Sequence, residues 1–104
     1  MFQLMVDAGF AAAHALRGYQ GKCENLHGHN YKVQLTVQGN ELDQTGMVFD
    51  FKQLKRWLKD ALDRLDHQCL NGLEPFRAAN PSAENLARHI YHELAPQIAG
   101  SIGS

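Results

Sequence analysis

The residues best suited to chemistry are one thiol and two imidazoles that lie close together, those of Cys23, His27 and His29. The two histidines flank Gly28 and lead into an alternating segment over 31–38, which predicts a β-strand. Side chains two residues apart in a strand project from the same face, so both imidazoles would point together. A histidine pair of this kind is often an ordinary part of a strand, but two convergent imidazoles also make half of a zinc site. Cys23 suits either a metal ligand or a reactive thiol near the metal.

A third candidate ligand, His14, ends an earlier alternating segment. The even positions from 2 to 12 are apolar and His14 continues their parity, which predicts a strand with one buried face. The alanines at 11–13 would also suit a helix, but the alternation that precedes them favours the strand. The glycines of segment 17–25 predict a loop. Two antiparallel strands joined by this loop would bring His14 close to the histidine pair and supply three metal ligands.

Two helices are expected to follow the strands. Asp50 is a suitable N-cap residue, with Gln53 at the reciprocal capping-box position. The apolar residues after it recur at helical spacing and predict one buried stripe, made of Phe51, Leu54, Trp57, Leu58, Ala61, Leu62 and Leu65. A second helix is expected to open at Asn80–Pro81 and to be closed by Pro96. Its expected buried stripe consists of Leu86, Ala87, Ile90, Tyr91 and Leu94, with His89 and His92 left on the surface.

Asp66 and His67 are adjacent at the expected end of the first helix. The simpler interpretation is a polar last turn, in which the helix dipole favours a histidine. The functional interpretation is a carboxylate–imidazole pair that carries protons. The sequence pattern around the pair favours the simpler interpretation.

Composition narrows the classes of protein that the chain can belong to. The 104 residues and a hydrophobic content of 44% suit one compact domain over 1–104. A net charge of −1 gives no broad basic field for nucleic acid, and no apolar run approaches the length of a membrane span. The apolar start lacks the basic region of a signal peptide. Two cysteines give no disulfide framework, so we expect reduced thiols and a cytoplasmic protein.

Five motifs in one order resemble the 6-pyruvoyl-tetrahydropterin synthase superfamily, and within it the 6-carboxy-tetrahydropterin synthases of queuosine and deazapurine biosynthesis. They span nearly the whole chain, and together they are specific. The motifs are Phe10-Ala11-Ala12-Ala13-His14, Cys23-x-x-x-His27-Gly28-His29-Asn30-Tyr31, Gly46-Met47-Val48-Phe49-Asp50-Phe51, Leu65-Asp66-His67-x-x-Leu70-Asn71 and Asn80-Pro81-Ser82-Ala83-Glu84-Asn85. The short interval between Cys23 and His27 is more similar to the carboxy branch.

The resemblance implies an α+β tunnelling fold, in which an antiparallel sheet carries two helices on one face. Subunits of this family join their sheets into a barrel and commonly stack as paired trimers. The resemblance therefore implies a homohexamer made of two trimers. The family continues with two more strands, the last of which usually carries a glutamate that grips the pterin ring. Nothing before Ser104 resembles that strand pair, so we expect it to be absent from this chain.

The resemblance also implies roles for the candidate residues. His14, His27 and His29 would bind Zn²⁺, Cys23 would be the catalytic thiol, and Asp66 with His67 would complete a proton relay. The implied reaction converts the small molecule 7,8-dihydroneopterin triphosphate to 6-carboxytetrahydropterin, releasing triphosphate and acetaldehyde. One alternative is a 6-pyruvoyl-tetrahydropterin synthase, which releases no acetaldehyde, and another is a non-catalytic zinc-binding assembly module. Phosphate-binding cations are suggested only loosely, at Arg17, Lys22 and Arg77.

Overall fold

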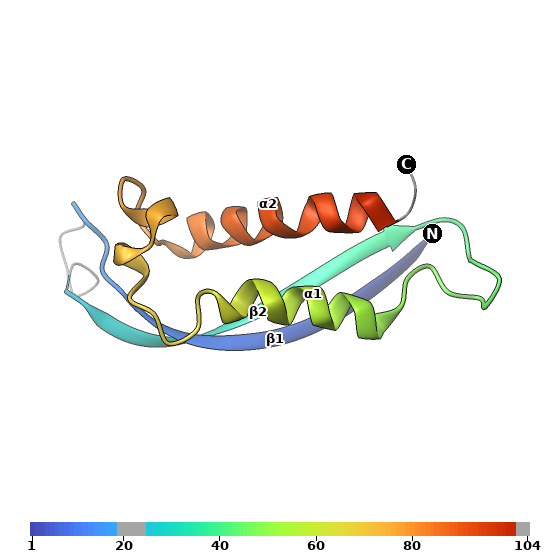
Figure 1. Cartoon of the computed structure of the whole chain (residues 1–104), viewed down its shortest axis with the longest axis horizontal. Coiled ribbons are helices and arrows are strands. Elements are labelled where there is room, and N and C mark those ends of the chain that lie inside the picture. Colours follow the sequence, from blue (N-terminus) through green and yellow to red (C-terminus); the bar gives the residue numbers. More distant parts are fainter. Residues whose placement is uncertain (19–24, 102–104) are drawn as a thin grey trace.

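Two long strands and two helices make up an elongated α+β structure about 52 Å long. The computed structural model describes residues 1–18 and 25–101 (Figure 1). The elements in chain order are β1 (Phe2–His14), β2 (His27–Gly39), α1 (Phe51–Asp63), the short 3₁₀ turns η2 (Leu70–Gly72) and η3 (Glu74–Phe76), and α2 (Ala83–Ser101).

The two strands pair antiparallel along their whole length. Phe2 lies opposite Gly39 and His14 lies opposite His27, so the candidate ligands meet at the end of the hairpin where the chain passes from β1 to β2. Val6 and Phe10 are buried while the odd positions between them are exposed or partly exposed, which confirms the alternation expected from the sequence. The alanine run belongs to this strand rather than to a helix.

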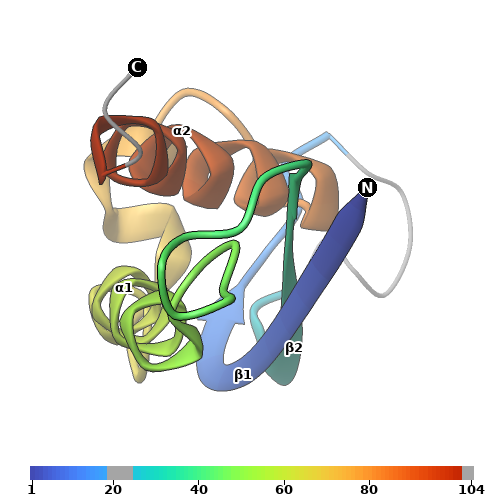
Figure 2. The ribbon, with the colours of Figure 1, turned by 90° about the vertical axis from the view of Figure 1, so that its right-hand side faces the viewer.

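Both helices lie over one face of the sheet, where α1 packs against β1 and α2 lies beside α1 (Figure 2). The side chains that α1 buries in this core belong to Leu54, Leu58, Ala61 and Leu62. Asp50 caps α1 by accepting a hydrogen bond from the Lys52 amide at 2.9 Å. The expected burial of Phe51 is wrong, because this residue starts the helix at the margin of the core and stays exposed.

Helix α2 does not end where the sequence suggests. It begins at Ala83 and continues through Pro96 to Ser101. An internal proline loses one backbone hydrogen bond and strains the turn before it. Ile98 continues the buried row of Leu94 and packs against the core, which favours continuation of the helix.

The buried stripe of α2 is narrower than expected. Ala87 and Tyr91 are exposed, because the core-facing row takes one residue per turn, from Leu86 through Ile90 to Leu94. His92 is exposed as expected, and His89 is not fully on the surface.

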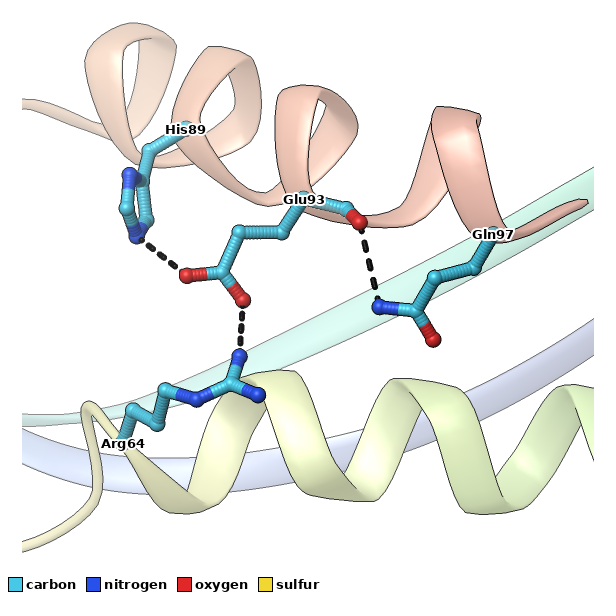
Figure 3. A network of polar contacts seen from close by, with 4 residues as sticks. All are labelled: Arg64, His89, Glu93 and Gln97. Atoms are coloured by element: carbon cyan, nitrogen blue, oxygen red, sulfur yellow. Dashed lines mark hydrogen bonds and ion pairs between the residues drawn. The ribbon is translucent and has the colours of Figure 1, made fainter.

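A polar network ties the end of α1 to α2 (Figure 3). Arg64, the C-cap residue of α1, pairs with the Glu93 carboxylate, which also lies 3.2 Å from His89 Nε2. The Gln97 amide donates to the Glu93 carbonyl at 3.2 Å. The ring of His89 also contacts Phe76, so this network links α2 to the segment between the helices.

The described part of the chain has no helix with both the length and the apolar character that a membrane crossing needs.

Candidate active site

Three histidines converge at the end of the hairpin where β1 ends and β2 begins. His14 ends β1, while His27 and His29 begin β2, opposite His14 and Ala12. Residues that face each other in an antiparallel pair project from the same side of the sheet, which is why all three imidazoles meet. One ring nitrogen of each lies within 4.8 Å of the other two, and Nε2 of His14 is 3.1 Å from Nε2 of His27. This set could hold one metal ion.

Backbone carbonyls orient two of these rings. His14 Nδ1 lies 2.7 Å from the Pro81 carbonyl oxygen, and His27 Nδ1 lies 2.7 Å from that of Asn25. A carbonyl oxygen only accepts, so each Nδ1 must carry the hydrogen and each Nε2 must present its lone pair. Two lone pairs that face each other repel unless a cation lies between them. The donor set therefore fits zinc, which takes neutral imidazoles oriented by such outer bonds.

Tyr31 completes an aromatic wall beside the histidines. Its ring stacks on Phe10 with centroids 4.8 Å apart and meets the rings of His14 and His29 edge-on. Its hydroxyl is buried and finds no hydrogen-bond partner within residues 1–18 and 25–101. Burial raises the pKa of this phenol, so it stays neutral. The sequence indicates Tyr31 only as a strand residue, because its contact with two imidazoles depends on the register.

Asp66 and His67 lie across β1 from the histidines of β2. Helix α1 has already ended at Asp63, so the pair belongs to the turn that follows the helix. The Asp66 carboxylate lies 2.9 Å from His67 Nδ1, and its other oxygen accepts from the Ala11 amide at 2.9 Å. The Ala11 hydrogen bond, and then His67, hold the pKa of Asp66 below its usual value. This carboxylate therefore anchors the strand as well as the imidazole.

His67 combines an exposed ring with a strained backbone. Its φ of 59° lies in the left-handed region, which a non-glycine residue rarely adopts. Its side chain is 82% exposed. Strain of this kind persists where surrounding contacts enforce it, and it is concentrated at functional sites. The contact with Asp66, the exposed ring and the backbone conformation are compatible with the carboxylate–imidazole interpretation.

A shallow depression of about 480 Å³ lies next to both groups. It is lined by His29, His67, Gln68, Cys69, Gly28, Asn30 and the alanines 11–13. Its volume lies in the range of small-molecule sites. Cys69 contributes an exposed free thiol to this lining. The sequence around Cys69 gives no signal of this position. Cys23, the thiol that the sequence favours, lies outside the described residues.

Two of the loosely suggested phosphate partners have other contacts. The Arg17 guanidinium donates to the Phe76 carbonyl at 2.7 Å, and Arg77 Nε lies 3.4 Å from the Gly72 carbonyl. Both cations hold the segment between the helices. Lys22 lies outside the described residues.

Fold and site together define an α+β protein that can hold one metal ion between two paired strands. The chain belongs to the 6-pyruvoyl tetrahydropterin synthase family, whose model matches residues 3–103.

Curated relatives agree with this assignment. The 6-carboxy-5,6,7,8-tetrahydropterin synthase of Haemophilus influenzae is 36% identical, with all of this chain and 89% of that protein covered. The enzyme of the same name from Rickettsia felis is 32% identical, with 86% and 77% covered. The solved structure of Caenorhabditis elegans 6-pyruvoyl tetrahydropterin synthase superposes with a TM-score of 0.81 at 33% identity, covering 89% of this chain and 76% of the other. The chain is thus an enzyme of the pterin synthase type.

Proposed function

We propose that the chain is a zinc-dependent 6-carboxy-5,6,7,8-tetrahydropterin synthase of queuosine biosynthesis. Its substrate would be 7,8-dihydroneopterin triphosphate, and its products 6-carboxytetrahydropterin, triphosphate and acetaldehyde. The observation that carries the proposal is the convergence of His14, His27 and His29 within 4.8 Å. The names of the curated relatives favour the carboxy product.

The three histidines would hold the metal through one nitrogen each. When bound, zinc would supply a Lewis acid that polarises an oxygen of the substrate side chain. Three protein ligands leave a coordination position open, as catalytic zinc sites require. The carbonyls that accept from His14 and His27 keep both rings in the ligating orientation.

Proton transfer is the work of Asp66, His67 and Cys23. The His67 Nδ1 hydrogen faces Asp66, so Nε2 remains to accept or release a proton at the substrate. Asp66 orients the ring and stabilises its charged form, while the Ala11 amide fixes the carboxylate. We assign Cys23 the role of catalytic base on the family resemblance, since a thiolate near a cation is a competent base.

A homo-oligomer is part of the proposal. Two strands alone are marginal in water, and β2 pairs only with β1 within the described residues. An open strand edge favours pairing with another chain, because its backbone N–H and C=O groups lack partners. Closure of the sheets into a barrel pairs these groups. We therefore propose a homohexamer of two trimers, each trimer closing one barrel.

Turnover tests the proposal directly. The purified protein with zinc is expected to consume 7,8-dihydroneopterin triphosphate and release acetaldehyde with 6-carboxytetrahydropterin, detected by chromatography and mass spectrometry. The 6-pyruvoyl product without acetaldehyde would instead support the activity in the name of the structural relative. No conversion of any pterin by fully zinc-loaded protein would favour a non-catalytic assembly module and overturn the proposal.

Two variants separate the proton-transfer groups from the ligands. His67→Ala and Cys23→Ala should each keep zinc while turnover falls about 10²–10⁴-fold, the usual effect of removing an acid–base group. The exposed His92→Ala serves as the control. Metal content and rate are measured on the same sample. Loss of zinc together with activity in Cys23→Ala would make that thiol a ligand.

A further inference from the structure

The second edge of β1 is covered by a segment that is not a strand. The backbone amides of Ala11 and Ala13 in β1, and those of Ala15 and Arg17 just beyond its end, donate to the segment over 66–80. The four acceptors, in the same order, are the Asp66 carboxylate, the Gln68 carbonyl, the Asn71 side chain and the Asn80 side chain. This edge segment lies at the histidine end of the molecule (Figure 1).

Asn71 and Asn80 each pair with the backbone through both ends of the side-chain amide. Asn71 accepts from the Ala15 amide at 2.8 Å and donates to the Ala15 carbonyl at 2.9 Å. Asn80 accepts from the Arg17 amide and donates to the Arg17 carbonyl, both at 2.8 Å. A primary amide offers one donor and one acceptor side by side, so it can replace a neighbouring strand at a single residue.

Asn80 is connected to the candidate metal site through the next residue, Pro81. Asn80 precedes Pro81, whose carbonyl accepts from His14 Nδ1 at 2.7 Å. The Asn80 carbonyl accepts in turn from the Asn85 side chain at 2.8 Å, which ties the segment to the first turn of α2. His14 and Arg17 thus contact two consecutive residues, Pro81 and Asn80, the second of which ends the edge segment.

We propose that Asn80, supported by Asn71, is a positioning residue for the metal site. By fixing the edge segment to the end of β1, it holds the Pro81 carbonyl against His14. The hydrogen of that imidazole then stays on Nδ1, and the Nε2 lone pair stays directed at the other two histidines. This role rests on the proposed function only in that the cluster binds zinc.

The test compares three variants with the wild-type protein. Asn80→Ala removes both hydrogen bonds to Arg17, and Asn80→Asp keeps the acceptor and the size but loses the donor. Asn40→Ala changes an exposed asparagine after β2 and is the matched control.

Zinc affinity is measured by competition with a chelator, and the Co²⁺-loaded proteins are compared by visible absorption. We expect about tenfold weaker zinc binding in Asn80→Ala, the effect usual for an outer-shell contact, with an altered Co²⁺ spectrum. Asn80→Asp should fall between Asn80→Ala and the control.

A metal-free measurement keeps this inference separate from zinc binding itself. Long-range ¹⁵N–¹H spectra report which ring nitrogen of His14 carries the hydrogen. We expect Nδ1 in the wild-type protein and a mixture of both nitrogens in Asn80→Ala. If the wild type binds no zinc, the proposed function fails, and the His14 spectra still decide the role of Asn80. Unchanged spectra and zinc affinity in folded Asn80→Ala and Asn80→Asp would limit Asn80 to a structural role and overturn the proposal.

Discussion

Replacing His27 and His29 together should abolish the stabilisation of this protein by zinc. His27 is half-buried and His29 is exposed, whereas His14 is only 7% exposed. The double variant His27→Ala/His29→Ala therefore removes two ligands without opening the core. His14 keeps its hydrogen bond to Pro81, so the end of β1 should stay in place. We expect the metal-free variant to unfold within a few degrees of the metal-free wild type.

The size of the effect follows from where the ligands lie. His14 belongs to β1 and the other two ligands to β2, so a bound ion would link the two strands at the end where the chain passes from one to the other. The unfolded chain does not hold the three nitrogens together, and a ligand at one hundred times its Kd then adds about 2.7 kcal/mol of stability. In a domain of this size 1 kcal/mol corresponds to about 4–8 °C, so zinc at that excess should raise Tm by roughly 10–20 °C.

Thermal unfolding followed by circular dichroism, with zinc or with a chelator, measures this shift. The wild type and the control His92→Ala, which alters an exposed histidine of α2, should both show it. In the double variant a single imidazole of the three-histidine cluster remains, and the shift should vanish. A zinc-dependent rise in Tm of similar size in the double variant would refute the three-histidine site. A wild-type Tm that is the same with zinc and with a chelator would also refute it.

Two further predictions concern the carboxylate and the assembly. The Ala11 amide lowers the pKa of Asp66 from its ordinary 3.8, so the stability that this carboxylate contributes is complete above that pH and is lost as the pH falls through the lowered pKa. Asp66→Asn should remove this part of the acid dependence in denaturant titrations at stepped pH, and an unchanged profile would contradict the Ala11 contact. Light scattering should give several times the monomer mass, because the outer edge of β2 needs a partner; a pterin-active monomer would contradict this expectation.

The sequence predicts the strands and the three-histidine cluster well for a physical reason. Alternation with period two reports which face of a strand is buried, and in an antiparallel hairpin that parity also decides which side chains meet. His14, His27 and His29 share the buried parity of their strands, so their convergence could be predicted once the hairpin was assumed. Tyr31 shares this parity, but its edge-on contacts with His14 and His29 depend on the exact register, which the alternation alone does not give.

The helix ends were harder to predict, because they depend on packing rather than on local propensity. Pro96 is a local stop signal, yet the contact of Ile98 with the core outweighs it. Phe51 fits the apolar stripe of α1 by spacing, but it is the first residue of the helix and stays 45% exposed. A pattern of residue types records the side of a helix that is apolar and does not record where its neighbours end.

The contacts least visible in the sequence are those that place the metal ligands. Asn71 and Asn80 pair with residues 56 and 63 positions earlier in the chain, and each replaces a strand at a single point. Such pairing has no periodicity, and an asparagine before a proline indicates locally only a turn. The carbonyl that orients His14 is likewise a backbone atom, which any residue type could supply. The resemblance to the family singled out both asparagines as parts of motifs without giving them a role. Their hydrogen bonds supply one, because a ligand at the end of a strand can be held only as firmly as that end itself.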